Sequence, residues 1–345
     1  MKKFIKNVLF CSACLPCVLV ATSCGEEKIT VDGDFAYSGK SSKRTLVEYR
    51  GTDTNVTLSS DYVAIDNQAF MNSERLEVIN IGENVKKISD EAFKSCAKLT
   101  TVNFGSKLES MGNNVFEGCI KLENIDVPKG VKTIGDGTFK DCTNLKDVTI
   151  GDGLTSLSTD LFKNCSALTS FNVPKGVETI NPAFGGCEAL TSITLPDGLK
   201  TIEDRAFANL NITTIDIPDT VEEIGSYAFY STDLSFIELP DSLTEIKEYT
   251  FGKTFKLVYV MVPAGLTKID NYAFYQSDIE RFFSKGSKAI DVDLVLGEAT
   301  GPSGETISYP EPIWYLLTPN GANETAKGNW WYYGSEGVII EKVIE

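Results

Sequence analysis

The sequence predicts a β-rich solenoid of about ten repeats of 22–23 residues, in which short helical or turn segments join parallel strands and a small β-rich segment caps the C-terminal end. Three observations predict this fold. Phenylalanine recurs at a nearly constant step, apolar residues alternate with polar ones after each of these phenylalanines, and the period disappears after Phe283. We therefore expect one elongated repeat domain between two flanking segments.

Residues 1–23 have the pattern of a secretion signal. Three lysines precede an apolar stretch from about residue 8 to 20, which is too short to span a bilayer and which Pro16 interrupts. The sequence ATSC that ends at Cys24 resembles a bacterial lipobox, which implies that Cys24 carries a lipid and becomes the first mature residue. The alternative is an ordinary signal peptide cut nearby, with Cys24 left as a free thiol.

Residues 24–44 are polar and rich in Gly, Ser, Lys and Glu. This composition is typical of a flexible tether, here between the membrane and the folded part of the chain. The repeats are predicted to occupy residues 45–284.

One phenylalanine marks each repeat. Steps of 22 or 23 residues separate the ten, which are Phe70, Phe93, Phe116, Phe139, Phe162, Phe184, Phe207, Phe229, Phe251 and Phe274. Because a single repeat cannot bury its apolar edge alone, the ten rings are expected to form an internal column between stacked coils. At about 4.8 Å per coil, the stack would be roughly 45–50 Å long.

Each repeat also carries a strand pattern that ends in a turn pattern. A leucine stands six residues after each of the first six phenylalanines, and two apolar residues separated by one residue follow, as in Ile125 and Val127. Such alternation places the apolar side chains inward and the others outward. Proline then ends many of the strands because it has no N–H to donate, and glycine two residues later suits a tight turn.

The order F-x-x-C-x-x-L-x-x-I-x-I-P-x-x-V-x-x-I closely resembles the BspA-like (treponemal-type) leucine-rich repeats over roughly residues 45–284. The match is looser after Phe207, Phe229 and Phe274, where the gap before the apolar pair is one residue shorter. The resemblance implies a leucine-rich-repeat solenoid in a surface lipoprotein with adhesion-type binding to host proteins.

Five cysteines follow the repeat phenylalanine by three residues, at Cys96, Cys119, Cys142, Cys165 and Cys187. Stacking places adjacent Cα atoms about 4.8 Å apart, but parallel Cβ atoms also stay near that spacing, which exceeds the roughly 3.5–4.5 Å of a disulfide. A straight row cannot form a tetrahedral metal cage either. We therefore predict a column of buried free thiols rather than disulfides or a metal site.

An aromatic strip distinguishes the C-terminal third of the repeats. Two series of positions are polar in the early repeats and aromatic or otherwise apolar in the later ones. The first series is the outward strand positions, and the second is the position two residues before the repeat phenylalanine. The predicted partner-binding residues are Phe236, Tyr259, Met261 and Phe283 in the first series and Tyr227, Tyr249 and Tyr272 in the second. The strip is a partner interface, a surface covered by the C-terminal segment, or an ordinary scatter of apolar residues on the surface.

Residues 285–345 are expected to form the β-rich cap. Runs 289–296, 313–317 and 337–344 have strand character, and turn signals lie between them. The Trp-Trp-Tyr-Tyr run at 330–333 is either the core of this small segment or a platform on which a glycan stacks.

Composition excludes several functions. The formal net charge is −16, and without the first 23 residues it becomes −19, from 29 basic and 48 acidic residues, so the surface repels nucleic acid. The absence of histidine removes Ser-His-Asp and Cys-His catalysis, and no phosphate loop, nucleophile elbow or metal signature is present. We expect no enzyme activity, no metal and no cofactor.

Two functions remain. The first is an extracytoplasmic, lipid-anchored binding or adhesion module for a protein or glycan of a host or neighbouring cell, held at the membrane through Cys24. The second is a structural or assembly lipoprotein that oligomerises, or joins another envelope protein, through its aromatic C-terminal strip.

Overall fold

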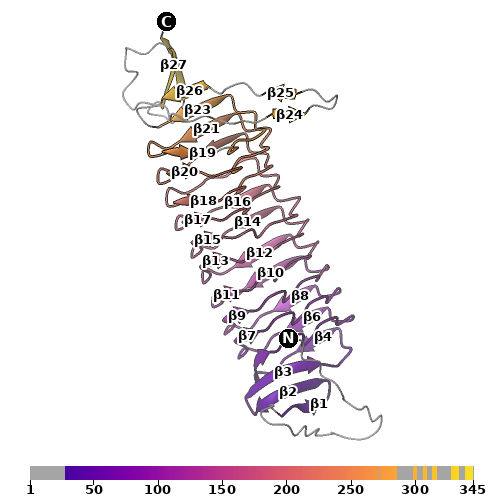
Figure 1. Cartoon of the computed structure of the whole chain (residues 1–345). Helices are drawn as coiled ribbons and strands as arrows, with labels where there is room; N and C mark the ends of the chain where they lie inside the picture. Colours follow the sequence, from indigo (N-terminus) through magenta and orange to yellow (C-terminus); the bar gives the residue numbers. More distant parts are fainter. Residues whose placement is uncertain are drawn as a thin grey trace.

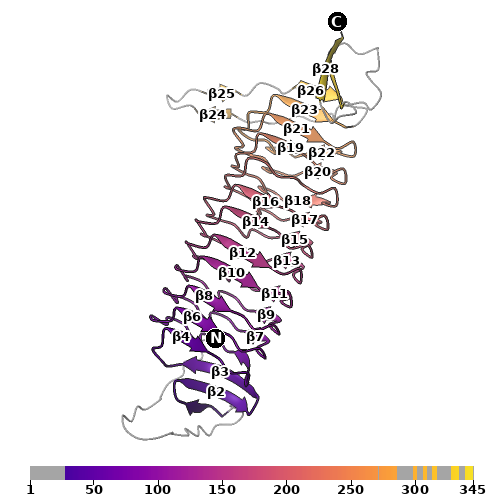
Figure 2. The same cartoon turned by 180° about the vertical axis from the view of Figure 1, so that it is seen from behind.

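The computed structural model describes residues 28–270 and 272–285, followed by five strands at 298–300, 306–308, 313–316, 328–333 and 339–344. The predicted signal segment and Cys24 lie outside these residues, as does the predicted strand at 289–296. The described residues form an elongated stack of coils (Figures 1 and 2). Each coil has two strand-bearing sides and one side made of turns, and no helix occurs in the described residues. The predicted solenoid is therefore confirmed, with turns where helical or turn segments were expected.

The first strand-bearing side holds the longer strands. They form four short sheets ordered β4-β6-β8, β10-β12, β14-β16 and β19-β21-β23-β26. Their bounds are β4 Asn55–Thr57, β6 Val78–Asn80, β8 Thr101–Asn103, β10 Asn124–Val127, β12 Asp147–Ile150, β14 Ser170–Asn172, β16 Ser192–Thr194, β19 Phe236–Glu238, β21 Tyr259–Val262, β23 Arg281–Ser284 and β26 Ile313–Leu316.

The second side holds mostly two-residue strands. Beyond the N-terminal cap they are β5 Tyr62–Ile65, β7 Lys87–Ile88, β9 Ser110–Met111, β11 Thr133–Ile134, β13 Ser156–Leu157, β15 Thr179–Ile180, β17 Thr201–Ile202, β18 Glu223–Ile224, β20 Glu245–Ile246 and β22 Lys268–Ile269. Wherever strands of neighbouring coils pair on these two sides, they pair in parallel, with equivalent repeat positions opposite each other, as Ile125 is to Val148. Stacking in register is what turns the sequence period into columns of side chains.

The ten repeat phenylalanines form the predicted internal column. Each is at most 1% exposed, and neighbouring rings stack with centroids 4.8–6.2 Å apart. Burial of one such side chain contributes roughly 2–3 kcal/mol. Because each ring packs against the ring of the neighbouring coil, the column stabilises the stack of coils and not an isolated coil.

The turn side is joined from coil to coil by backbone hydrogen bonds. The N–H of Phe93, for example, donates to the carbonyl of Val115 in the next coil at 2.9 Å. Residues two before and two after most repeat phenylalanines have φ between +54° and +75°. This left-handed backbone recurs beside the peptide groups that bond along the stack, and it favours Gly, Asn and Asp.

One coil departs from the pattern. The apolar pair after Phe207, which is Ile215 and Ile217, forms no strand, although Ile217 is 6% exposed and Ile215 packs against the core. This repeat is one of those in which the gap before the pair is one residue shorter. The first strand-bearing side therefore has no strand in this coil, which lies between β16 and β19.

The N-terminal end corrects the predicted tether at residues 24–44. β1 Thr30–Asp32, β2 Phe35–Lys40 and β3 Lys43–Tyr49 form an antiparallel unit, and β3 pairs in parallel with β5. Leu46 is fully buried, and the ring of Tyr49 lies 5.1 Å from that of Phe70. Alternating apolar residues on β2 and β3 thus cover the first coil, which would otherwise expose its core.

One of the C-terminal strands, β26, continues the stack. β26 pairs in parallel with β23 and so extends the first strand-bearing side, whereas β24 Glu298–Thr300 pairs with β25 Thr306–Ser308, and β27 Gly328–Tyr333 with β28 Ile339–Ile344, both antiparallel. The predicted strands at 313–317 and 337–344 correspond to β26 and β28.

Candidate binding site: a tyrosine ridge on the C-terminal coils

The predicted aromatic strip divides between two sides of the solenoid. Phe236, Tyr259, Met261 and Phe283 lie on β19, β21 and β23, on the first strand-bearing side. The three tyrosines of the second series lie instead on the turn side, after β18, β20 and β22. The two series are therefore not one continuous surface.

On the strand side the prediction is wrong for two residues. Met261 is 1% and Phe283 is 3% exposed, although neither belongs to the core cluster. Both side chains are therefore buried and not available to a partner. Phe236 remains 37% exposed, and Tyr259 is half-buried with the guanidinium of Arg281 5.6 Å from its ring centroid.

On the turn side the tyrosines form a stack. The ring centroids of Tyr227 and Tyr249 are 4.8 Å apart with an angle of 15° between the rings, and those of Tyr249 and Tyr272 are 5.4 Å apart at 8°. Tyr227 and Tyr249 are half-buried, and Tyr272 is 38% exposed. Equivalent positions in successive coils thus bring together three side chains that are 22 and 23 residues apart in sequence.

Two further tyrosines flank the stack. Tyr230 lies 5.4 Å from Tyr227 and Tyr275 lies 5.8 Å from Tyr272, both with their rings tilted or edge-on. The equivalent position in the coil between them is Gly252, where an added Cβ would lie 2.9 Å from the ring of Tyr230. Glycine therefore leaves the space that the Tyr230 ring fills. We call Tyr227, Tyr230, Tyr249, Tyr272 and Tyr275 the tyrosine ridge.

Charged side chains accompany the ridge. The guanidinium of Arg205 lies 4.4 Å from the Tyr227 ring centroid, and the ammonium of Lys253 lies 5.7 Å from that of Tyr230. Burial, with the nearby Tyr227 and Glu248, raises the pKa of Tyr249. The Tyr249 hydroxyl is therefore protonated at neutral pH.

The backbone beneath the ridge is unfavourable for tyrosine. Tyr227, Tyr249 and Tyr272 have φ of 60°, 56° and 64°. The left-handed conformation costs an L-residue roughly 1–2 kcal/mol, and each aromatic pair contributes about 0.5–1.5 kcal/mol in return. Stacking therefore roughly offsets the backbone cost and leaves little net gain in stability.

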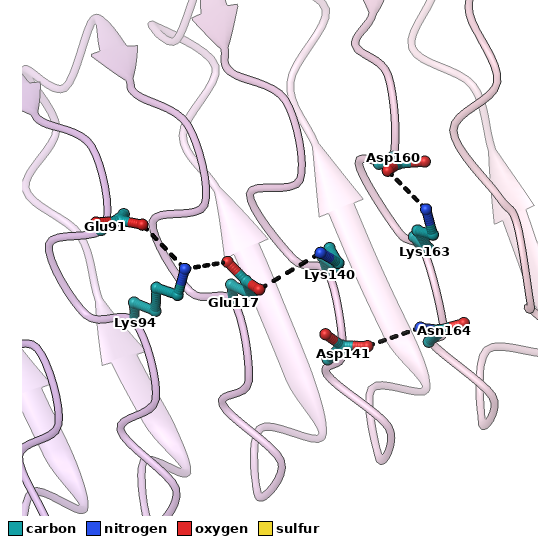
Figure 3. A network of polar contacts seen from close by, with 8 residues as sticks. All are labelled: Glu91, Lys94, Glu117, Lys140, Asp141, Asp160, Lys163 and Asn164. Atoms are coloured by element: carbon teal, nitrogen blue, oxygen red, sulfur yellow. Dashed lines mark hydrogen bonds and ion pairs between the residues drawn. The ribbon is translucent and has the colours of Figure 1, made fainter.

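The same two columns carry ion pairs in the N-terminal coils. Figure 3 shows Lys94 between Glu91 and Glu117, with Nζ–Oε distances of 2.9 and 2.8 Å, and Lys140 3.5 Å from Glu117. Glu91 occupies the position equivalent to Tyr249, and Lys94 the position equivalent to Tyr275. The turn side thus changes along the stack from a charged surface to an aromatic one.

The cysteine column is fully buried, and its five thiols are free. Each Sγ donates to the phenylalanine carbonyl of the preceding coil at 3.0–3.3 Å. Burial raises the pKa of Cys96, Cys142 and Cys187 to about 12. The prediction of buried free thiols is confirmed, and the column offers no reactive nucleophile.

Within the described residues, no group of three or more Cys, Asp or Glu side chains is placed to hold a metal ion. The same part of the chain contains no long apolar helix of the kind that crosses a bilayer.

Sequence reasoning did not single out two residues that shape the ridge. Arg205 stands 22 residues before Tyr227, in the same column, and Gly252 stands between Tyr230 and Tyr275 in the other. Aligning the repeats by column, rather than reading aromatic residues alone, would have identified both.

Comparisons with known proteins agree with the repeat architecture. The profile described as "BspA type Leucine rich repeat region" matches residues 63–183 and 161–280 with six copies. The chain is similar to the crystal structure of a leucine-rich repeat protein from Bacteroides ovatus, with 25% identity, a TM-score of 0.59 and coverage of 74% of this chain and 76% of that one.

Two further solved structures share the likeness. One is a leucine-rich cell surface protein from Faecalibacterium prausnitzii (22% identity, TM-score 0.43, covering 75% of this chain and 89% of that one). The other is the T. pallidum leucine-rich repeat protein (20% identity, TM-score 0.40, covering 67% and 91%). No curated protein matched the chain. The match of the repeat profile over more than half of the sequence shows that this chain belongs to the family of BspA-type leucine-rich repeat proteins.

Proposed function

We propose that this protein is a non-enzymatic binding module of the bacterial cell surface, which adheres to a protein of a host or neighbouring cell through its tyrosine ridge. One observation carries the proposal. Two columns that hold ion pairs in the N-terminal coils hold tyrosines in the C-terminal ones, and the three tyrosines of one column lie on a backbone that disfavours them. Because stacking only offsets that cost, stability does not account for tyrosine at positions that hold Gln68, Glu91 or Asn114 in other coils.

The chemistry of the ridge suits a protein partner better than a glycan. Tyrosine is enriched in protein interfaces because it brings a large rigid contact surface at a small loss of side-chain entropy. Sugars bind aromatic side chains through open ring faces, but within the ridge most faces are occupied by neighbouring tyrosines or by Arg205. A protein surface can use the ring edges and hydroxyls that remain.

The proposed location is extracytoplasmic, with a lipid on Cys24 as the membrane anchor. The anchor would then be attached at the N-terminal end of the stack, and the ridge lies on the coils nearest the C-terminal end (Figure 1). This arrangement would hold the ridge away from the membrane by most of the length of the solenoid.

The test is binding of the chain from residue 25 onward to an array of extracellular-matrix proteins and glycans. Tyr249→Ser, in the middle of the ridge, should weaken binding to the protein that is captured by about 30-fold, the effect of losing a strong interface residue. Phe255→Ser is the control, since Phe255 is 54% exposed but lies outside the ridge. Binding that Tyr249→Ser leaves unchanged contradicts the proposed site, and capture of glycans alone contradicts the proposed partner class.

The exposed Phe236 favours one second candidate, self-assembly through the strand side. A discrete oligomer in sedimentation that Phe236→Ser converts to monomer would support assembly. A monomer for both chains supports the binding module instead.

A further inference from the structure

The tyrosine stack has a cation at one end. Arg205, Tyr227, Tyr249 and Tyr272 occupy the same repeat position in four successive coils, and the Arg205 guanidinium lies over the outer face of Tyr227, 4.4 Å from the ring centroid. The chain itself therefore shows that a guanidinium fits the end of this column. Aromatic faces attract cations because the ring quadrupole places negative charge there.

In the part of the chain that the structure describes, the other end of the stack is open. In residues 28–270 and 272–285, the ring partners of Tyr272 are Tyr249, stacked on one face, and Tyr275, edge-on at 75°. The face of Tyr272 that points away from Tyr249 has no ring and no cation over it in this part of the chain. Tyr272 is also one of only five large apolar side chains there that are more than one-third exposed, at 38%.

The surrounding coils carry excess negative charge. Residues 201–285 include 14 acidic and seven basic residues, a net charge of −7. Glu248 is exposed and adjacent in sequence to the middle ring of the stack. The field at this end of the solenoid therefore attracts cations and repels anions.

From the open face, the seated arginine and the charge, we infer that the partner supplies an arginine side chain whose guanidinium stacks on the outer face of Tyr272. The inference rests on the proposed function and names the chemistry of its partner as a basic protein surface. In the complex, the column would consist of Arg205, the three tyrosines and the arginine of the partner, so each molecule would supply one cation. Arginine suits this position better than lysine because its guanidinium is planar, weakly hydrated and stacks on aromatic rings.

The experiment is an NMR titration of tyrosine-labelled protein with the peptide acetyl-Gly-Arg-Gly-amide. Its counterpart with citrulline in place of arginine has nearly the same shape without the charge. We expect the Tyr272 ring signals to shift saturably with the arginine peptide and to respond at least about threefold more weakly to the citrulline peptide, as for an exposed cation–π contact. Tyr272→Leu should remove the response, and Phe255→Leu should retain it.

A second variant tests the same geometry from the other end. Arg205→Ala uncovers the outer face of Tyr227, so the arginine peptide should then shift the Tyr227 ring as well. Equal responses to both peptides, no saturable shift at Tyr272, or a stronger response of Tyr272 to a soluble oligosaccharide would each overturn the inference. The array test with Tyr249→Ser is independent of this titration. If binding of the captured protein depends on Tyr249 but Tyr272 does not respond to the arginine peptide, the inference fails and the proposed function stands.

Discussion

Where the position three residues after a repeat phenylalanine holds a buried polar side chain, that side chain is hydrogen-bonded in one of two ways. The thiol of Cys119 donates to the carbonyl of Phe93 in the preceding coil, whereas the hydroxyls of Thr232 and Ser277 donate to the phenylalanine carbonyl of their own coil. Each buried polar group therefore finds an acceptor, which is the condition for burying it at little cost. Cysteine, threonine and serine are therefore interchangeable there, and Leu210 fills the same position in its coil without a donor.

The thiol column makes a prediction for the chain from residue 25 onward. Its five thiols should not react with a thiol reagent at mildly alkaline pH while the protein is folded, because burial raises their pKa values and excludes the reagent. Denaturation without a reductant should then release five reactive groups, counted by thiol titration. Finding one or none would show that the column is oxidised.

At the scale of the element, the N-terminal cap is the main departure from expectation. Sequence reasoning classed residues 24–44 as a tether because polar residues predominate. However, Tyr37 is 9% exposed, is packed edge-on 6.2 Å from Tyr62, and is covered by the Arg44 guanidinium at 4.4 Å. A few apolar residues on alternating strand positions are enough to close the first coil, and composition over a window of 20 residues does not detect them.

Removal of the cap separates the two interpretations. A chain that begins at residue 45 should lose about 3–5 kcal/mol of stability relative to one that begins at residue 28, because the outer strands with Tyr37 and Ala36 no longer cover the first coil. Chemical denaturation measures the difference, and size-exclusion chromatography should show association through the exposed strand edge. Equal stability of the two chains would mean that residues 28–44 act as a tether after all.

Over the whole molecule, two electrostatic effects oppose each other as the pH falls. The net charge of −16 disfavours the compact state, and that repulsion declines toward the sequence pI of about 4.6. Hydrogen bonds from Gln68 and Lys94 lower the pKa of Glu91, and the ammonium of Lys86 lowers that of Glu109. A carboxyl group with a lowered pKa stabilises the fold above its unfolded value, and this contribution is lost as the pH falls through the folded value.

We therefore expect stability to be highest between neutral pH and the ordinary carboxyl pKa of 4.5, and to fall steeply below it. Denaturation midpoints in urea across this range measure the profile. Glu91→Gln should flatten the acid limb, because the glutamine does not titrate, and Glu77→Gln serves as the exposed control without an ion pair to lysine or arginine among the described residues. Stability that rises continuously as the pH is lowered below 4.5 would show that charge repulsion dominates.

The repeat period alone was enough to predict the parallel coils, the phenylalanine column and the thiol column. When coils stack in register, residues 22 or 23 positions apart become neighbours, so one-dimensional periodicity translates directly into contacts. Three features depended on contacts that no period contains: the cap over Phe70, the burial of Met261 and the space at Gly252. Each is decided by how side chains from different segments fill the same volume, and only the folded arrangement specifies that volume.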